Sequence, residues 1–188
     1  CAKDLCERGV LKKNAVVGTV MTNIGFNRFC GENNLDFVAT KVGDRYVLEE
    51  MLKNDYNFGG EQSGHIIFRD YSTTGDGQLT AVQLLNILKN SDKKFSELAG
   101  VMKKFPQVML NVKVDNLKKL NFAVDEEVKN AIEKVSKEFE LKNNGRILVR
   151  ASGTEPLIRV MLEGEDLTRI TALANEIANL VKKRLTEV

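Results

Sequence analysis

Four polar side chains lie close together in a glycine-rich stretch that leads into an apolar segment. The stretch GGEQSGHIIF contains Glu61, Gln62, Ser63 and His65, and His65 is the sole histidine among 188 residues. An ionised carboxylate accepts hydrogen bonds, a hydroxyl donates and accepts, and an imidazole does either. Such groups on one turn suit the hydroxyl or amino groups of a sugar. The alternative is an ordinary turn, with a solvent-facing Glu61 and a histidine that belongs to the following strand.

A second loop, far along the chain, has the composition of an anion site. In RASGTEPLIR, the small residues Ser152, Gly153 and Thr154 allow backbone N–H groups to converge, and two hydroxyls add donors. Arg150 and Arg159 each offer a planar guanidinium that pairs well with a phosphate dianion. The alternative is a polar hairpin loop with two solvated arginines.

Lys41 is a third candidate, at the end of the strand-like segment DFVATK. An ammonium at this place neutralises a phosphate, or carries a proton if its pKa is lowered. A lysine that is simply exposed on the surface is the alternative.

The composition argues against several classes of protein. A formal charge of +2 is too small to suggest nucleic-acid binding. No apolar run approaches the ~20 residues that span a bilayer, so no membrane association is expected. The three cysteines, Cys1, Cys6 and Cys30, lack the spacing of a zinc site, and no other metal site is expected. Reduced thiols are typical of cytoplasmic proteins.

Strand-like and helix-like segments alternate through the first half of the chain. This alternation predicts a three-layer α/β/α domain with a mainly parallel sheet over residues 1–105. Asn23 or Thr22 is suited to cap the first of its helices, and Asp76 precedes the helix expected over 77–90. The expected strands are 15–21, 35–40 and the segments on either side of the turn near 61–65, and the expected helices are 24–29, 43–54, 77–90 and a connector over 91–105.

Residues 106–188 predict a small α+β domain with a largely antiparallel sheet. A strand over 107–114 precedes a helix with acids in its first turn, from about residue 125 to 140. Two strands then flank the RASGTEP loop. An apolar stripe at helical spacing runs through the last 20 or so residues and predicts a final helix.

Together, GGEQSGHIIF, TTGDG and RASGTEPLIRV resemble the third and fourth domains of the α-D-phosphohexomutase superfamily, and TKVGDRYVLEEM also fits the third domain. The resemblance covers essentially the whole chain and is closest to the amino-sugar branch, which Gln62 also favours. It implies an isomerase that interconverts glucosamine 6-phosphate and glucosamine 1-phosphate, and that feeds UDP-N-acetylglucosamine and peptidoglycan synthesis. A phosphoglucomutase or phosphomannomutase of the same superfamily is an alternative, and so is a non-catalytic module that binds sugar phosphate.

The resemblance implies a role for each candidate residue. Glu61 and Ser63 match the loop that binds the sugar. Lys41 and His65 match positions near the reacting oxygen, with Lys41 a candidate for general acid/base catalysis. The loop that holds the non-reacting phosphate is matched by Arg150, Ser152, Gly153, Thr154 and Arg159.

The resemblance also implies a phosphoserine, a magnesium ion and glucosamine 1,6-bisphosphate as the intermediate. The sequence has no serine loop of that kind and no Asp-Gly-Asp-type loop for magnesium, since Gly75–Gly77 includes only one acid. Both elements belong to the first two domains of the superfamily. We therefore expect a C-terminal fragment that binds a phosphorylated hexosamine, has the N-terminal domains of its parent chain as partners, and is inactive alone.

Overall fold

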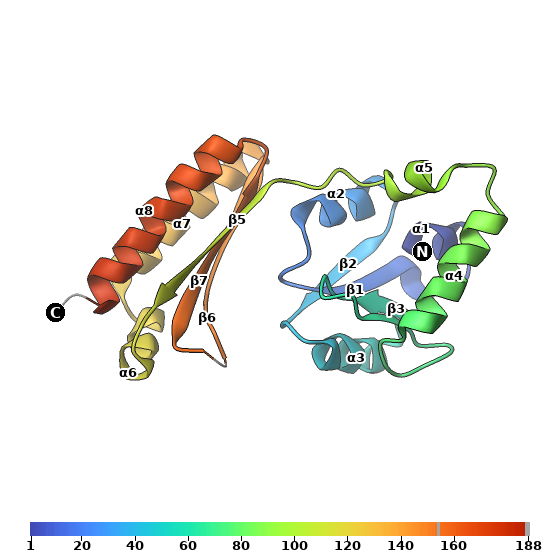
Figure 1. The fold of residues 1–188 in the computed structure, drawn as a ribbon, viewed down its shortest axis with the longest axis horizontal. Helices are drawn as coiled ribbons and strands as arrows, with labels where there is room; N and C mark the ends of the chain where they lie inside the picture. The colour runs from blue at the N-terminus through green and yellow to red at the C-terminus, as the bar shows by residue number, and fades with distance from the viewer. Residues whose placement is uncertain (154, 187–188) are drawn as a thin grey trace. The chain divides into compact units, whose positions relative to one another are not determined.

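The computed structural model describes residues 1–153 and 155–186. The chain divides into two compact units, Cys1–Lys104 and Phe105–Val188. Each unit has its own sheet (Figure 1). Each also has its own buried apolar core. None of the helices within the described ranges has the length and apolar character needed to cross a bilayer.

The first unit is built on a four-stranded sheet of order β2-β1-β3-β4. Strand β1 (Ala15–Thr19) is parallel to both β2 (Asp36–Thr40) and β3 (Phe58–Gly60), while β4 (Ile66–Phe68) is antiparallel to β3. All five residues of β1 are buried, as expected for an apolar strand at the centre of a layered sheet. The prediction of a mainly parallel sheet is confirmed.

Helices cover both faces of this sheet. On one face, α1 (Ala2–Glu7), α2 (Ile24–Glu32) and Leu79 of α4 (Gly77–Lys89) pack with Val16 in one cluster. On the other face, α3 (Asp44–Lys53) packs against Val17 in a second cluster. Figure 1 shows α2 and α3 on opposite sides of the strands. Since successive strand residues point to opposite faces, Val16 and Val17 support different layers, and the three-layer prediction is confirmed.

Side-chain caps begin two of the helices. Asn23 accepts a hydrogen bond from the Gly25 N–H, and Asp76 accepts from the N–H groups of Gln78 and Leu79. Each cap satisfies backbone donors that the first turn of a helix leaves free. The helix α1 and the short 3₁₀ helix η1 (Lys12–Asn14) were not predicted.

The connector differs from its prediction. A helix was expected over 91–105, but only α5 (Phe95–Ala99) is helical. Glu97 accepts from the Lys94 N–H and marks the beginning of α5, and Gly100 ends it. The chain then passes close over α2, where a Cβ on Gly25 would lie 2.0 Å from the Lys103 carbonyl oxygen. This close packing of the connector on α2 is a tertiary contact that helix propensity does not reveal.

The second unit has a three-stranded sheet of order β5-β7-β6 in which every pairing is antiparallel. The strands are β5 (Gln107–Lys113), β6 (Gly145–Ala151) and β7 (Leu157–Gly164). The prediction of a largely antiparallel sheet is confirmed. Two short elements after β5, the helix α6 (Asn116–Lys119) and the 3₁₀ helix η2 (Leu120–Ala123), were not predicted.

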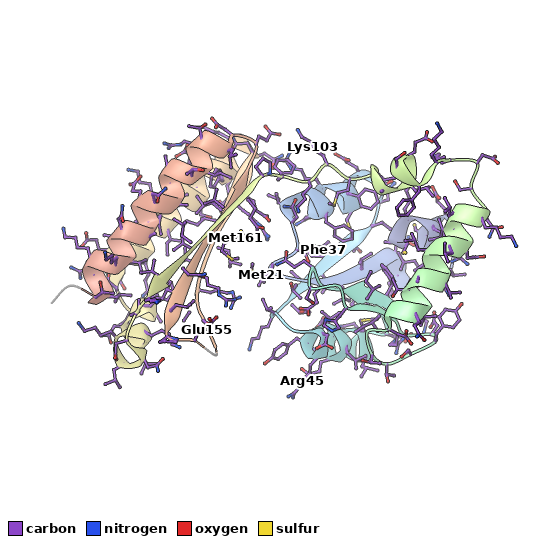
Figure 2. All side chains as sticks on the ribbon, in the orientation of Figure 1. Met21, Phe37, Arg45, Lys103, Glu155 and Met161 are labelled. Atoms are coloured by element: carbon purple, nitrogen blue, oxygen red, sulfur yellow. The ribbon has the colours of Figure 1, made fainter. Side chains whose placement is uncertain are left out.

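The two faces of the second sheet differ in chemistry. The helices α7 (Glu126–Lys142) and α8 (Leu167–Thr186) pack on the face that carries Ile158, Val160 and Leu162. The alternate residues of β7 point the other way, and Figure 2 shows Met161 projecting away from α7 and α8. This second face carries Arg159 and the fully buried Glu163, whose carboxylate accepts from the Arg146 Nε at 2.7 Å.

Candidate functional site

The residues predicted to bind sugar lie where the parallel strands end. Lys41 follows the last residue of β2, and the turn formed by residues 61–65 follows β3. In open α/β sheets, ligands bind outside the carboxyl ends of the strands, at the point where the strand order reverses. Here the reversal occurs at β1, which has β2 on one side and β3 on the other. The topology therefore brings both segments to the edge of the sheet that is suited to a ligand.

The turn between β3 and β4 is tight and depends on glycine. The Glu61 N–H donates to the His65 carbonyl oxygen at 2.9 Å, and the Gly64 N–H donates to the Glu61 carbonyl oxygen at 3.1 Å. Gly64 has φ +103°, a conformation that other residues rarely adopt, and a Cβ on Gly60 would lie 2.7 Å from the His65 carbonyl oxygen. The backbone thus places four polar side chains, those of Glu61, Gln62, Ser63 and His65, on one short turn.

Glu61, Ser63 and His65 form a chain of hydrogen bonds. The Ser63 Oγ donates to the Glu61 Oε1 at 2.5 Å and lies 2.9 Å from the His65 Nδ1. Because the hydroxyl has a single proton and gives it to the carboxylate, it must accept from an Nδ1–H. A neutral His65 therefore keeps its Nε2 unprotonated, as a hydrogen-bond acceptor on a side chain that is 53% exposed.

The same Glu61 carboxylate joins this turn to the loop after β2. Its Oε2 accepts from the Gly43 N–H at 3.1 Å, and the side chain is only 10% exposed. Lys41 belongs to that loop, and its Nζ lies 5.8 Å from the centre of the Tyr46 ring, a cation–π contact. Tyr46 was not predicted as a site residue. Its position in TKVGDRYV, one helical turn after Gly43, is the feature of the sequence from which its place beside Lys41 could have been inferred. The structure thus brings Lys41, Glu61, Ser63 and His65 to neighbouring loops.

A cavity of about 410 Å³ adjoins the turn. Apolar side chains of β1, β3 and α2 line much of its wall, and a few polar groups converge on it, a combination that is typical of small-molecule sites. Gln62 contributes here, and Thr22, expected only as a helix cap, is a further member of the wall. The polar side chains of the wall are Thr22, Asn23, Glu61, Gln62 and Lys104.

The predicted anion loop joins β6 to β7 in the second unit. Ser152 is 4% exposed; its N–H donates to the Leu157 carbonyl oxygen at 2.9 Å, and its Oγ accepts from the Glu155 N–H at 3.2 Å. These two bonds close the turn that Figure 2 marks with Glu155. Gly153 is exposed at the tip of the turn. Thr154 lies outside the described residues.

Arg150 and Arg159 lie side by side, as a directly paired couple on β6 and β7. The Arg159 Nη2 contacts the Glu155 Oε2 at 2.5 Å, whereas Arg150 has no carboxylate partner in the part of the chain that the structure describes. Burial lowers the pKa of Arg150, and the positive charge of Arg159 lowers it further. Across the same residues, the Nε atoms of both arginines are buried without a hydrogen-bond partner. Two guanidinium groups with one carboxylate leave an excess of positive charge, which an anion relieves.

A lysine side chain also contacts this loop. Lys119 of α6, which was not predicted, donates to backbone carbonyl oxygens of the turn.

For magnesium, residues 1–153 and 155–186 contain no group of three or more acidic, histidine or cysteine side chains placed to hold an ion. The single acid of the Gly-Asp-Gly stretch, Asp76, is engaged as a helix cap. The described residues therefore do not fit a magnesium ion.

Two family models match the chain, in order. The model for phosphoglucomutase/phosphomannomutase, alpha/beta/alpha domain III, matches residues 1–105, and that for the C-terminal domain matches residues 109–180. The phosphoglucosamine mutase of Caldanaerobacter subterraneus subsp. tengcongensis is 55% identical over 185 residues, and that of Clostridium botulinum is 54% identical. Each alignment covers 98% of this chain and 41% of the relative. The chain thus spans about two fifths of the length of the relatives it matches.

Solved structures share the fold at low sequence identity. The N-acetylphosphoglucosamine mutase of Aspergillus fumigatus superposes with a TM-score of 0.79 at 19% identity, covering 97% of this chain and 40% of the other. A phosphoglucomutase/phosphomannomutase family protein of Burkholderia thailandensis has a TM-score of 0.73 at 16% identity, covering 97% and 40%. Since both family models match in sequence order, the resemblance seen in the sequence is confirmed. The chain belongs to the phosphoglucomutase/phosphomannomutase family, of which it contains domain III and the C-terminal domain.

Proposed function

We propose that this chain supplies the sugar-binding and phosphate-binding parts of a mutase that interconverts glucosamine 6-phosphate and glucosamine 1-phosphate. The reaction passes through a phosphoserine and a bisphosphorylated sugar. The observation that carries the proposal is the 54–55% identity to phosphoglucosamine mutases along 98% of the chain. The two polar loops support it, because a sugar phosphate has hydroxyl groups and a phosphate to be held.

In the first unit, Glu61 and Ser63 bind hydroxyl groups of the hexose. A carboxylate has about four lone-pair sites, so Glu61 still has capacity after its bonds to Ser63 and Gly43. His65 presents an unprotonated Nε2 near the reacting oxygen, where it accepts a hydrogen bond or a proton. Lys41 acts beside it as the candidate general acid/base.

In the second unit, Arg150, Ser152 and Arg159 hold the phosphate that does not react, together with Gly153 and Thr154. A mutase binds its substrate in two opposite orientations, so the distal phosphate needs a clamp that does not recognise the sugar. Charge-assisted forks and hydroxyl donors meet this need. Arg150 is partly desolvated and lacks a carboxylate partner in the described residues. A bound dianion is therefore expected to stabilise its charge more than that of Arg159.

The phosphoserine and the magnesium ion belong to this proposal as parts of the parent enzyme. Since the described residues do not fit magnesium, no step on this chain involves the metal. The chain is proposed to bind the phosphorylated hexosamine, to act with the preceding domains of its family, and to show no turnover alone. The free thiols of Cys1, Cys6 and Cys30 support the cytoplasm as its location.

Calorimetric titration with glucosamine 6-phosphate tests the phosphate clamp. Because a hydrogen bond to a charged group contributes about 1.5–3 kcal/mol, Arg150→Ala is expected to weaken binding by at least tenfold. Arg169→Ala, which removes an arginine paired with Glu138 on the surface of the same unit, is the matched control. Equal affinity of the wild type and Arg150→Ala excludes the assigned role.

Turnover assays with different hexose phosphates distinguish the members of the family. The purified chain is expected to leave glucosamine 6-phosphate unchanged, and the parent mutase is expected to prefer the glucosamine phosphates over those of glucose and mannose. The Arg150→Ala change in the parent raises KM. Formation of glucosamine 1-phosphate by the isolated chain contradicts the proposal that turnover requires the preceding domains. A preference of the parent mutase for mannose phosphates contradicts the proposed substrate.

A further inference from the structure

A lysine from α6 contacts both ends of the turn between β6 and β7. The Lys119 Nζ donates to the carbonyl oxygen of Ser152 at 2.9 Å and to that of Glu155 at 3.1 Å. These two residues bracket the tip of the turn. An ammonium has three N–H donors, so one lysine is able to make both bonds at once.

The contact with Ser152 sets the direction of the next peptide group. In a trans peptide the carbonyl and the following N–H point in opposite directions, and the described residues contain no cis peptide bond. A Ser152 carbonyl that points to Lys119 therefore directs the Gly153 N–H to the opposite side of the turn. Lys119 also holds two carbonyl oxygens, whose partial negative charge would repel a phosphate.

The Glu155 carbonyl is held twice. It accepts from the Leu157 N–H at 2.9 Å as well as from Lys119. The Glu155 side chain in turn contacts Arg159. A single lysine therefore supports the backbone of a residue whose carboxylate orients one of the two neighbouring guanidinium groups.

We propose that Lys119 is a positioning residue for the phosphate loop: it clamps the Ser152 and Glu155 carbonyls so that the Gly153 N–H faces the anion. This inference rests on the proposed function. It assigns to Lys119 a role that acts through the loop and not through direct contact with the phosphate.

Lys118 is the natural control for charge. It precedes Lys119 on α6 and borders a surface pocket together with Asp115, Glu155 and Pro156. Within the described ranges its side chain makes no hydrogen bond to the loop. Lys118→Met and Lys119→Met thus remove the same charge from adjacent positions, but only the second removes the clamp.

Amide hydrogen exchange of the unliganded chain, followed by NMR, is the first test. The amides of Ser152, Glu155 and Leu157 donate within the turn and report whether it is closed. Lys119→Met is expected to speed their exchange by at least tenfold, because it removes two charge-assisted bonds. Lys118→Met and Lys119→Arg are expected to leave it near the wild-type rate. The amides of β5 serve as the control for the intact sheet.

Titration with inorganic phosphate and with glucosamine 6-phosphate is the second test. Lys119→Met is expected to bind both ligands about tenfold more weakly, while Lys118→Met and Lys119→Arg bind nearly as the wild type does. Unchanged exchange of the turn amides in Lys119→Met overturns the inference. So does an equal loss of affinity in Lys118→Met, which assigns the effect to charge alone. If the wild type binds neither ligand, the proposed function fails, and exchange alone decides the role of Lys119.

Discussion

Glu61 serves the fold and the site with one carboxylate. Its Oε1 accepts from Ser63 within the turn, and its Oε2 accepts from the backbone of Gly43 in another loop. The turn therefore cannot move away from the loop that carries Lys41 without losing a hydrogen bond to a nearly buried charge. The residue proposed to bind the sugar is also the residue that keeps the two loops together.

The first prediction concerns this carboxylate. Glu61→Gln keeps the shape of the side chain but replaces one acceptor oxygen with an NH₂ group, which faces either the Ser63 hydroxyl or the Gly43 N–H. Hydrogen bonds to charged groups contribute about 1.5–3 kcal/mol, so the first unit is expected to lose about 1 kcal/mol or more of its free energy of unfolding. Urea denaturation followed by NMR signals of residues 1–104 measures it. Glu49→Gln, at an exposed pair with Arg45, is expected to have a much smaller effect, and an equal loss in both variants contradicts the argument.

Residue types and spacing were enough to predict which polar side chains share a loop. The glycine, hydroxyl and arginine content of such a loop is a local property of the sequence. The partners were not predictable in this way: Gly43 lies 18 residues before Glu61, and Lys119 lies 33 residues before Ser152. Only the topology of each unit brings these residues together, and the sequence contains no spacing rule for such contacts.

At the scale of elements, an ion pair joins the beginning of α7 to the end of α8. Asp125 is the N-cap of α7, where its carboxylate accepts from the Val128 N–H at 3.0 Å, and it also contacts the Arg184 Nε at 3.0 Å. The bond from the Val128 N–H lowers the pKa of Asp125 below its ordinary value of 3.8, and Arg184 lowers it further. The charged form is therefore the one that the folded unit favours.

The second prediction follows from that lowered pKa. Asn is also a good N-cap, so Asp125→Asn removes the charge and keeps the cap, and it is expected to cost about 0.5–1 kcal/mol at pH 7. Since the pKa is lower in the folded state than in the unfolded state, the stabilisation is complete above about pH 5 and is lost as the pH falls through the folded pKa. Denaturation of the second unit across pH 2–7 measures it. A difference between wild type and variant that does not shrink as the pH falls from 5 to 2 contradicts the assignment.

Most elements followed from patterns that a single segment contains. β1 is a mostly apolar, β-branched run, and α8 has its buried residues Ile170, Ile177 and Val181 at helical spacing. The prediction of a helix over 91–105 was wrong because packing over Gly25 sets the path of this connector. The elements α6 and η2 were missed because Leu117 and Leu120 are exposed and Phe122 alone packs on the core, so no periodic burial marks them.

At the scale of the whole molecule, each unit builds its core from its own residues. The cluster between the helices and the sheet of the second unit includes Val128, Ile158 and Ile177. The clusters of the first unit draw on residues before Lys104, such as Val17 and Met51. A chain with separate cores is expected to unfold in two cooperative steps.

The third prediction tests this separation with one cavity in each core. Ile177 and Met51 are at most 1% exposed, and truncation of such residues to alanine costs about 2–5 kcal/mol. Ile177→Ala is therefore expected to lower the melting temperature of the second unit and to leave that of the first nearly unchanged, while Met51→Ala does the reverse. Scanning calorimetry detects the two transitions, and hydrogen exchange assigns each to residues 1–104 or 105–186. Equal shifts of both transitions by either variant would show that the units unfold as one body, and the separate cores would then not act as independent units of stability.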